Sequence, residues 1–413
     1  MQARVCLDFS IAGLEILRVR QSPPERITWL KQALLVAQQI NDSAAERTLL
    51  HELGHTYFVV GASDEATQTA RHLLQIAEAS GDDFNMGRAW YVLGQAGLHV
   101  GALDDADNAF RKSVALLEKV GAEAELGRAF QGMGRVAMYS GDSPRALDFF
   151  RRYLQIVERS GREAELVPAY LTMNHVLLEL RDYSSAKVYA ERALQICLNT
   201  GFQRMLPSIW LSLGVTEAEL GNLEAACRHY EAGIAVSRLV QAKSSLIEIQ
   251  WYFGDARMRQ QNYVEAYTYL QEALRLAHEN HILYFLCEIT AALTRWHLEQ
   301  NQTAAACEPL REALGYAQQL GSDNFLAVVF VPAIMLWRQA NRADQAAQWA
   351  GVLSLHAEYV NPRLFNPLCA QLEQELGAER YNRALEAGKS YTLKDAVTEV
   401  VEQLDRLEIE AQK

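Results

Sequence analysis

The chain has 413 residues, half of them apolar and 22% charged, with a formal net charge of -12. This composition is typical of a folded soluble protein and excludes extensive disorder. The acidic balance opposes binding to nucleic acid or to an anionic membrane, and we expect neither as a partner.

Six cysteines are scattered along the chain without a C-x-x-C pair, at positions 6, 197, 227, 287, 307 and 369. This spacing favours reduced core residues over a disulfide framework, and therefore a cytoplasmic location. Asp8 and Glu15 interrupt the N-terminal segment where an export signal needs an apolar stretch, and no later stretch reaches membrane-spanning length. We expect no targeting or anchoring segment.

Residues 1–41 begin the chain with a predicted helix pair that caps one end of the fold. Its turns fall at Gln21 and Asn41, and the sequence Ser22-Pro23-Pro24-Glu25 is a capping box that predicts a helix start. Arg26 stands where the later repeats carry alanine, so we interpret this first pair as degenerate.

Residues 42–360 follow as eight predicted helix pairs with a period of 40 residues. One alanine column repeats at this spacing: Ala66, Ala106, Ala146, Ala186, Ala226, Ala266, Ala306 and Ala346. Turn residues precede each alanine and recur halfway through each period, so every period is two helices of roughly 17 residues. Ser43 and Ser143 are predicted N-caps of two of these helices.

A glycine column lies inside the first helix of most pairs. Its positions hold Gly54, Gly94, Gly134, Asn174, Gly214, Gly254, Thr294 and Ile334. A glycine in mid-helix costs about 1 kcal/mol relative to alanine. Its recurrence therefore predicts a close contact between helices that a larger side chain would block.

The glycine, the large apolar residue before it and the alanine twelve residues later resemble the tetratricopeptide repeat over residues 42–360. Trp90, Trp210, Phe110, Phe150 and Tyr230 match its aromatic positions. The period is longer than the roughly 34 residues of that family, and the family's proline in the second helix is missing. The resemblance implies an all-α fold, a right-handed α-solenoid of antiparallel helix pairs whose first helices line a concave groove.

Residues 361–413 lose the 40-residue rhythm and predict two or three shorter helices that form a C-terminal cap. Their stretch LGAERYNRALEAGKSYTLKDAV resembles the segment that follows the repeats in many STAND signalling ATPases and LuxR-type regulators. The long repeats are similar to the sensor domains of maltose-regulator-like members. This resemblance implies an inducer-binding sensor attached to upstream NTPase and linker domains, which are absent here, since no G-x-x-x-x-G-K-[ST] motif occurs.

The sequence HELGH matches the H-E-x-x-H signature of zinc metalloproteases. On a helix, His51 and His55 would share one face and Glu52 could act as a general base. Gly54, however, belongs to the glycine column, and Gly61 stands where a metzincin would place its third ligand. We therefore expect no metal, no cofactor and no catalytic set, and we interpret both histidines as groove residues.

The groove face predicted from the resemblance comprises positions six and three before the glycine column and one and five after it. Arginine pairs with oxyanions and aromatic rings stack on flat faces, so their alternation here favours a carboxylate, phosphate or sugar ligand. The alternative is that these side chains pair with acids on neighbouring helices or pack locally. The candidate ligand-binding residues are Arg88, Tyr91, Gln95, Arg128, Gln131, Arg135, Tyr139, His175, Trp251, Asp255 and Arg295.

Three functional hypotheses follow. The first is a non-catalytic sensor whose groove binds a small-molecule, peptide or protein inducer and regulates an attached STAND NTPase. The second is a free-standing tetratricopeptide scaffold for protein-protein interaction. The third is a zinc peptidase built around HELGH, which the repeat pattern disfavours.

Overall fold

The computed structural model describes residues 4, 7–8, 11–14 and 21–411. Within these residues the chain forms α-helices and two short 3-10 helices, and no β-strand. The prediction of an all-α helical-repeat fold is confirmed. Most of the first predicted helix, in residues 1–20, and Cys6 lie outside the described residues.

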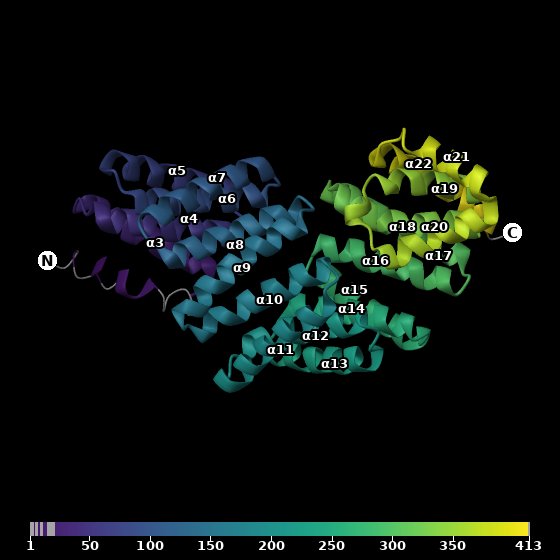
Figure 1. Ribbon diagram of the computed structural model, residues 1–413, viewed down its shortest axis with the longest axis horizontal. Helices are drawn as coiled ribbons and strands as arrows, with labels where there is room; N and C mark the ends of the chain where they lie inside the picture. Colours follow the sequence, from purple (N-terminus) through teal and green to yellow (C-terminus); the bar gives the residue numbers. More distant parts are fainter. Residues whose placement is uncertain (1–3, 5–6, 9–10, 15–20, 412–413) are drawn as a thin grey trace. The chain divides into compact units, whose positions relative to one another are not determined.

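The chain divides into two compact units, Met1–Ile196 (unit 1) and Cys197–Lys413 (unit 2). In each unit, successive helices run antiparallel and stack side by side (Figure 1). The helices of unit 1 are α3 Pro23–Gln39, α4 Ser43–Val59, α5 Ser63–Ser80, α6 Asp83–His99, α7 Leu103–Lys119, α8 Glu123–Tyr139, α9 Ser143–Ser160 and α10 Glu163–Glu179. The boundary between the units falls inside α11, Tyr183–Thr200.

Unit 2 continues the helix pairs and then adds the C-terminal helices. Its elements are η1 Gln203–Met205, α12 Leu206–Glu219, α13 Leu223–Leu239, α14 Lys243–Arg259, α15 Tyr263–Glu279, α16 Leu283–Glu299, α17 Thr303–Leu320, α18 Asp323–Gln339, α19 Ala343–Ser354, η2 Ala357–Tyr359, α20 Pro362–Leu376, α21 Ala378–Gly388 and α22 Leu393–Ala411. Helix α20 packs against α18 and α19, and α22 packs against α17 and α18. The division into residues 1–41, 42–360 and 361–413 stays a prediction.

Residues with positive φ recur at intervals of 20 residues and end the helices. Glycine takes this place in many turns, as at Gly81 with φ 63°, because it has no Cβ to clash in the left-handed region. Its conformation lets the next backbone N–H, that of Asp82, reach back to the carbonyl of Ala77 at 2.9 Å. Because these turns are spaced 20 residues apart, most of the helices between them have nearly equal lengths.

Two of the predicted helix caps are wrong by one residue. The side chains of Asp42 and Asp142 accept the capping backbone hydrogen bonds at 3.0 and 3.1 Å, so Ser43 and Ser143 are the first helical residues. A carboxylate is as good a cap as a serine hydroxyl, and it also interacts favourably with the positive end of the helix dipole. The capping box at Ser22 is confirmed.

The repeated small residues form the contact between the two helices of a pair. Every member of the alanine column is 0% exposed. A Cβ added to Gly134 of α8 would lie 2.3 Å from the Phe150 ring of α9, and one added to Gly214 would lie 2.2 Å from the Tyr230 ring. The predicted close helix contact is therefore made by an aromatic ring that covers a bare stretch of backbone.

Asn174 shows how one pair accommodates a larger residue in the glycine column. The aromatic position opposite it holds Ala190, and the Asn174 amide donates a buried hydrogen bond to the Ala186 carbonyl at 3.0 Å. Ile334 also occupies the glycine column, and the aromatic position of its helix pair holds Ala350. A large residue on one helix is matched by a small one on its partner, so total volume is kept.

The described cysteines are free thiols. Four of them are buried and Cys369 is half-buried. Burial raises the pKa of Cys197 and Cys227, as expected for core thiols that are not poised to react. In the described part of the chain, every helix falls short of the length and apolarity that a membrane crossing requires.

Candidate functional site

Unit 1 contains a cavity of about 580 Å³ on the side of the first helices. Helices α4, α6, α8 and α10 contribute to its wall, together with the C-terminal half of α9. The side chains that give it chemical character are His55, Tyr91, Arg128, Gln131, Tyr153 and Arg162. The volume lies in the range of small-ligand pockets.

Three predicted ligand-binding residues, Tyr91, Arg128 and Gln131, meet in this cavity. Arg128 and Gln131 lie three positions apart on α8 and therefore share one helix face. A fourth predicted residue, Gln95, is buried, and its amide donates to the Tyr91 hydroxyl at 2.9 Å. Gln95 thus orients Tyr91 instead of contacting the cavity itself.

Arg128 is the uncompensated charge of the cavity. The acids around it already have partners, because Glu123 lies 3.3 Å from Arg159 and Glu165 lies 3.0 Å from Arg162. Among the described residues, neither Arg128 nor Gln131 has an ion pair or a hydrogen bond. A half-buried guanidinium without a counterion favours an incoming anion.

Tyr153 supplies a neutral polar group beside Arg128. Burial is the main cause that raises the pKa of Tyr153 to about 12, with Glu165 and Tyr91 acting in the same direction and Arg128 opposing. The phenol therefore stays protonated at neutral pH, and it can donate or accept a hydrogen bond. Sequence reasoning missed Tyr153 because it lies on α9, a second helix of a pair, three residues after the packing residue Phe150.

Arg88 follows the alternative interpretation, in which a groove arginine pairs with an acid of a neighbouring helix. Its guanidinium lies 3.6 Å from the Glu52 carboxylate and over the Phe84 ring. In a zinc protease with the H-E-x-x-H signature, the glutamate at this position would be the general base. Here Glu52 is buried and paired with Arg88, and His51 is buried as well. Over the residues that the structure describes, no group of three His, Cys, Asp or Glu side chains is arranged to hold a metal ion.

The remaining predicted residues of unit 1 do not line the cavity. Arg135 lies half-buried one turn beyond Gln131 on α8, and Tyr139 is exposed at the end of that helix. His175 is exposed on α10, with its ring 4.0 Å from Glu179 of the same helix. Arg135 is the closest of these to Gln131 along the chain, and it extends the polar face of α8.

The three predicted residues of unit 2 are engaged within the protein. Asp255 is hydrogen-bonded to Arg295 and lies 3.3 Å from Arg363. Trp251 is half-buried, with its ring 4.6 Å from that of Tyr252. These contacts match the alternative of pairing and packing, and they form a separate cluster in unit 2.

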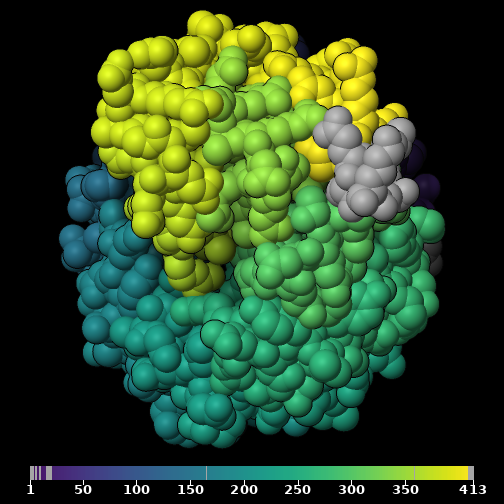
Figure 2. Space-filling model, turned by 90° about the vertical axis from the view of Figure 1, so that its right-hand side faces the viewer, coloured from purple at the N-terminus to yellow at the C-terminus, as the bar shows by residue number. Residues whose placement is uncertain are grey.

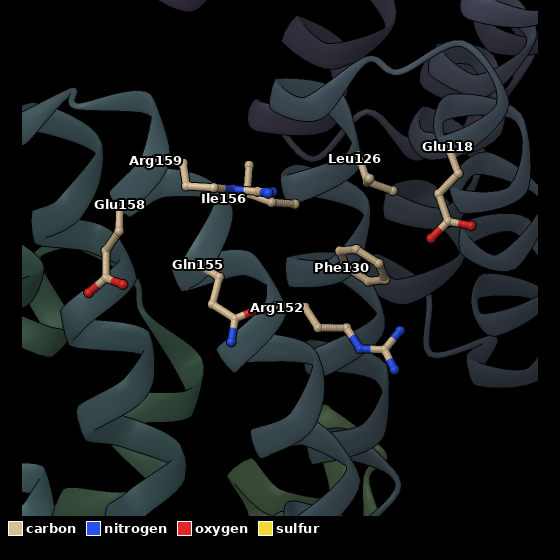
Figure 3. Close-up of a pocket in the computed structure, with 8 residues that line it drawn as sticks. All are labelled: Glu118, Leu126, Phe130, Arg152, Gln155, Ile156, Glu158 and Arg159. Carbon is tan, nitrogen blue, oxygen red and sulfur yellow. The ribbon is translucent and has the colours of Figure 1, made fainter.

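Unit 1 has a second cavity, of about 630 Å³, lined by side chains of α7, α8 and α9 (Figure 3). The Arg152 guanidinium lies over the Phe130 ring at 5.5 Å, and Arg159 pairs with Glu123. Its arginines are therefore engaged with aromatic or acidic neighbours, in contrast to Arg128. The cavity around Arg128 is the stronger candidate site.

No protein-family model and no curated protein matches the chain. Solved structures of Rap proteins share its fold at low identity. RapI in its apo form is 14% identical with a TM-score of 0.55, over 67% of this chain and 99% of that chain. A Rap protein complexed with competence and sporulation factor is 13% identical with a TM-score of 0.55, over 88% and 99%. Aspartyl phosphate phosphatase F from Bacillus subtilis is 14% identical with a TM-score of 0.51, over 87% and 92%. These similarities support a tetratricopeptide-like helical-repeat fold.

Proposed function

We propose that the chain is a non-catalytic binding scaffold, which holds a carboxylate-bearing segment of a partner peptide or protein in the cavity around Arg128. The observation that carries the proposal is the isolated guanidinium of Arg128, in a cavity whose other charges are paired. This is the interaction scaffold of the second hypothesis, with the partner's chemistry now specified.

The groups around Arg128 suit a peptide carboxylate. The guanidinium offers two parallel N–H donors to the two oxygens of an Asp, Glu or C-terminal carboxylate. Gln131 can both donate to and accept from a peptide backbone, and Tyr153 adds a neutral hydroxyl. The rings of Tyr91 and Tyr153 provide apolar surface for the neighbouring residue of the partner.

Two further observations agree with this proposal. One structural neighbour was solved in complex with competence and sporulation factor, so the same fold holds a bound factor in that protein. Fold similarity gives only an analogy, and the cavity of this chain carries the proposal. The free cysteines and the acidic composition are consistent with action in the cytoplasm.

A sensor role in a STAND ATPase is the second candidate function. The resemblance of residues 376–397 to the segment after STAND repeats favours it. In that case the occupant of the cavity would be the inducer, and NTPase and linker domains would belong to the same polypeptide. Both candidates use the same cavity, so the identity of the attached domains separates them.

Selection of random peptides on the immobilised full chain tests the proposal, followed by affinity measurements with the synthetic peptides. We expect selected peptides to carry an Asp, Glu or free C-terminal carboxylate, and to bind Arg128→Gln at least tenfold more weakly, a difference of about 1.4 kcal/mol. Arg152→Gln, in the second cavity, is the matched control and should bind like wild type. Peptides that bind Arg128→Gln with wild-type affinity would rule out this site.

A further inference from the structure

Unit 2 carries a row of alternating charges along three successive first helices, α12, α14 and α16. They occupy the positions one and five after the glycine column, which is the face predicted for the groove. Arg259 lies 3.4 Å from Glu219, Arg295 is hydrogen-bonded to Asp255, and Arg295 also lies 3.8 Å from Glu299. These five residues form what we call the inner charge row.

Arg363 of the C-terminal segment inserts into this row. Its Nη1 lies 2.7 Å from Glu219 Oε1 and its Nη2 lies 3.3 Å from Asp255 Oδ2. Asn361, the N-cap of α20, accepts a hydrogen bond from the Arg363 backbone N–H at 3.0 Å and fixes the start of the helix. Figure 2 shows the yellow C-terminal residues packed directly against the green helices of unit 2.

The guanidinium of Arg363 completes the charge balance of the row. Apart from Arg363, the arginines that pair with Glu219, Asp255 and Glu299 in the described part of the chain are Arg259 and Arg295. Burial by itself would raise the pKa of Asp255, but Arg295, Arg363 and Arg259 together hold it below its ordinary value. The row is therefore a negatively charged surface that one added cation neutralises.

The contact geometry is that of arginine recognition. Two carboxylates from neighbouring helices each take a different nitrogen of one guanidinium, whereas an ammonium group would have to serve both from a single nitrogen. The Arg363 side chain is 32% exposed, so solvent reaches the contact and a competing group has access to it. Arg363 lies 144 residues from Glu219 and 108 residues from Asp255 in the sequence, so the contact links the C-terminal segment to the inner charge row.

We propose that Glu219 and Asp255 form an arginine-binding site, that Arg363 fills it in cis, and that an arginine of a partner protein takes its place when residues 361–376 move away. The proposal concerns unit 2 alone and is independent of the cavity around Arg128. The C-terminal segment then acts as a built-in competitor, which lowers the affinity of the site for any external arginine.

Binding of N-acetyl-arginine methylamide to the full chain tests this proposal by calorimetry or NMR titration. Arg363→Ala should bind the probe saturably and at least tenfold more tightly than wild type, because the competing guanidinium is gone. Adding Glu219→Gln to that variant should lower its affinity at least tenfold. The corresponding lysine amide should bind Arg363→Ala more weakly than the arginine probe.

Arg380→Ala is the matched control, because Arg380 belongs to the same C-terminal helices but pairs with Asp344 outside the row. It should bind the probe no better than wild type. If Arg363→Ala loses helicity, Arg363→Lys takes its place, and this variant should still bind the probe more tightly than wild type. Equal binding by wild type and the folded Arg363 variant would overturn the proposal and leave a purely structural ion pair.

Discussion

Gly134→Ala tests whether glycine in the repeats is set by packing against the aromatic column. The new Cβ would lie 2.3 and 2.5 Å from two carbons of the Phe150 ring, well inside van der Waals contact. The ring is buried, at 1% exposure, so it cannot turn aside without displacing its neighbours. Overpacking of this kind costs about 1–3 kcal/mol, while alanine returns about 1 kcal/mol of helix propensity. The net result is an expected loss of up to ~2 kcal/mol.

Gly315→Ala is the matched control for this prediction. Gly315 also lies inside a helix, α17, but a Cβ there would have no atom within 4 Å. We expect this variant to gain ~1 kcal/mol from helix propensity alone. Urea unfolding monitored by far-UV circular dichroism measures both variants. Each variant is compared with wild type in the transition of its own unit, because repeat arrays need not unfold in one step. Stabilisation of the chain by Gly134→Ala would refute the packing argument.

Three further changes have expected outcomes in the same assay. Burial raises the pKa of Glu288 from its ordinary value of 4.5 to about 7 in the folded chain. Between these two pH values the folded chain keeps a proton that the unfolded chain loses, so the free energy of unfolding falls as the pH rises from about 4.5 to about 7. Glu288→Gln should therefore gain ~3 kcal/mol over wild type at about pH 8 and nothing at about pH 4. An equal effect at both pH values would contradict the assignment. Asp142→Ala removes the cap of α9 and should cost about 1 kcal/mol, with Asp142→Ser close to wild type. Asn174→Gly restores the glycine of the repeat but should destabilise the fold by ~1–2 kcal/mol, because it deletes the hydrogen bond to the Ala186 carbonyl. The small Ala190 in the aromatic position cannot fill the space that the asparagine leaves, and a gain in stability would contradict this account.

The helical-repeat architecture could be predicted because it depends on short-range patterns. Each alanine of the column is buried where the period places it, and the turn positions from Asn41 to Asn341 have positive φ. Asn361, the last expected turn position, has φ −70° and caps α20 instead. Gly134 and its counterparts predict close helix contacts from sequence alone, since a glycine in mid-helix is unfavourable unless such a contact requires it. The exact caps were missed at Asp42 and Asp142, because aspartate and serine compete for the same role one residue apart.

The candidate site could be predicted only in part. The face of α8 that carries Arg128 and Gln131 follows from helical periodicity, and Tyr91 follows from the 40-residue period. Periodicity does not reveal which charges find partners: Arg88 is held by Glu52 while Arg128 is not. The insertion of Arg363 between α12 and α14 depends on contacts more than 100 residues apart in sequence, which no local pattern encodes.

A double-mutant cycle between Arg128 and the carboxylate of a selected peptide measures whether the two groups interact. The peptide and its Asp→Asn or Glu→Gln analogue, or its C-terminal amide, are titrated against wild type and Arg128→Gln. We predict a coupling free energy of at least ~1 kcal/mol, because each single change should remove the same charge-assisted pair. A coupling of zero, with the two changes additive, would contradict carboxylate binding at Arg128.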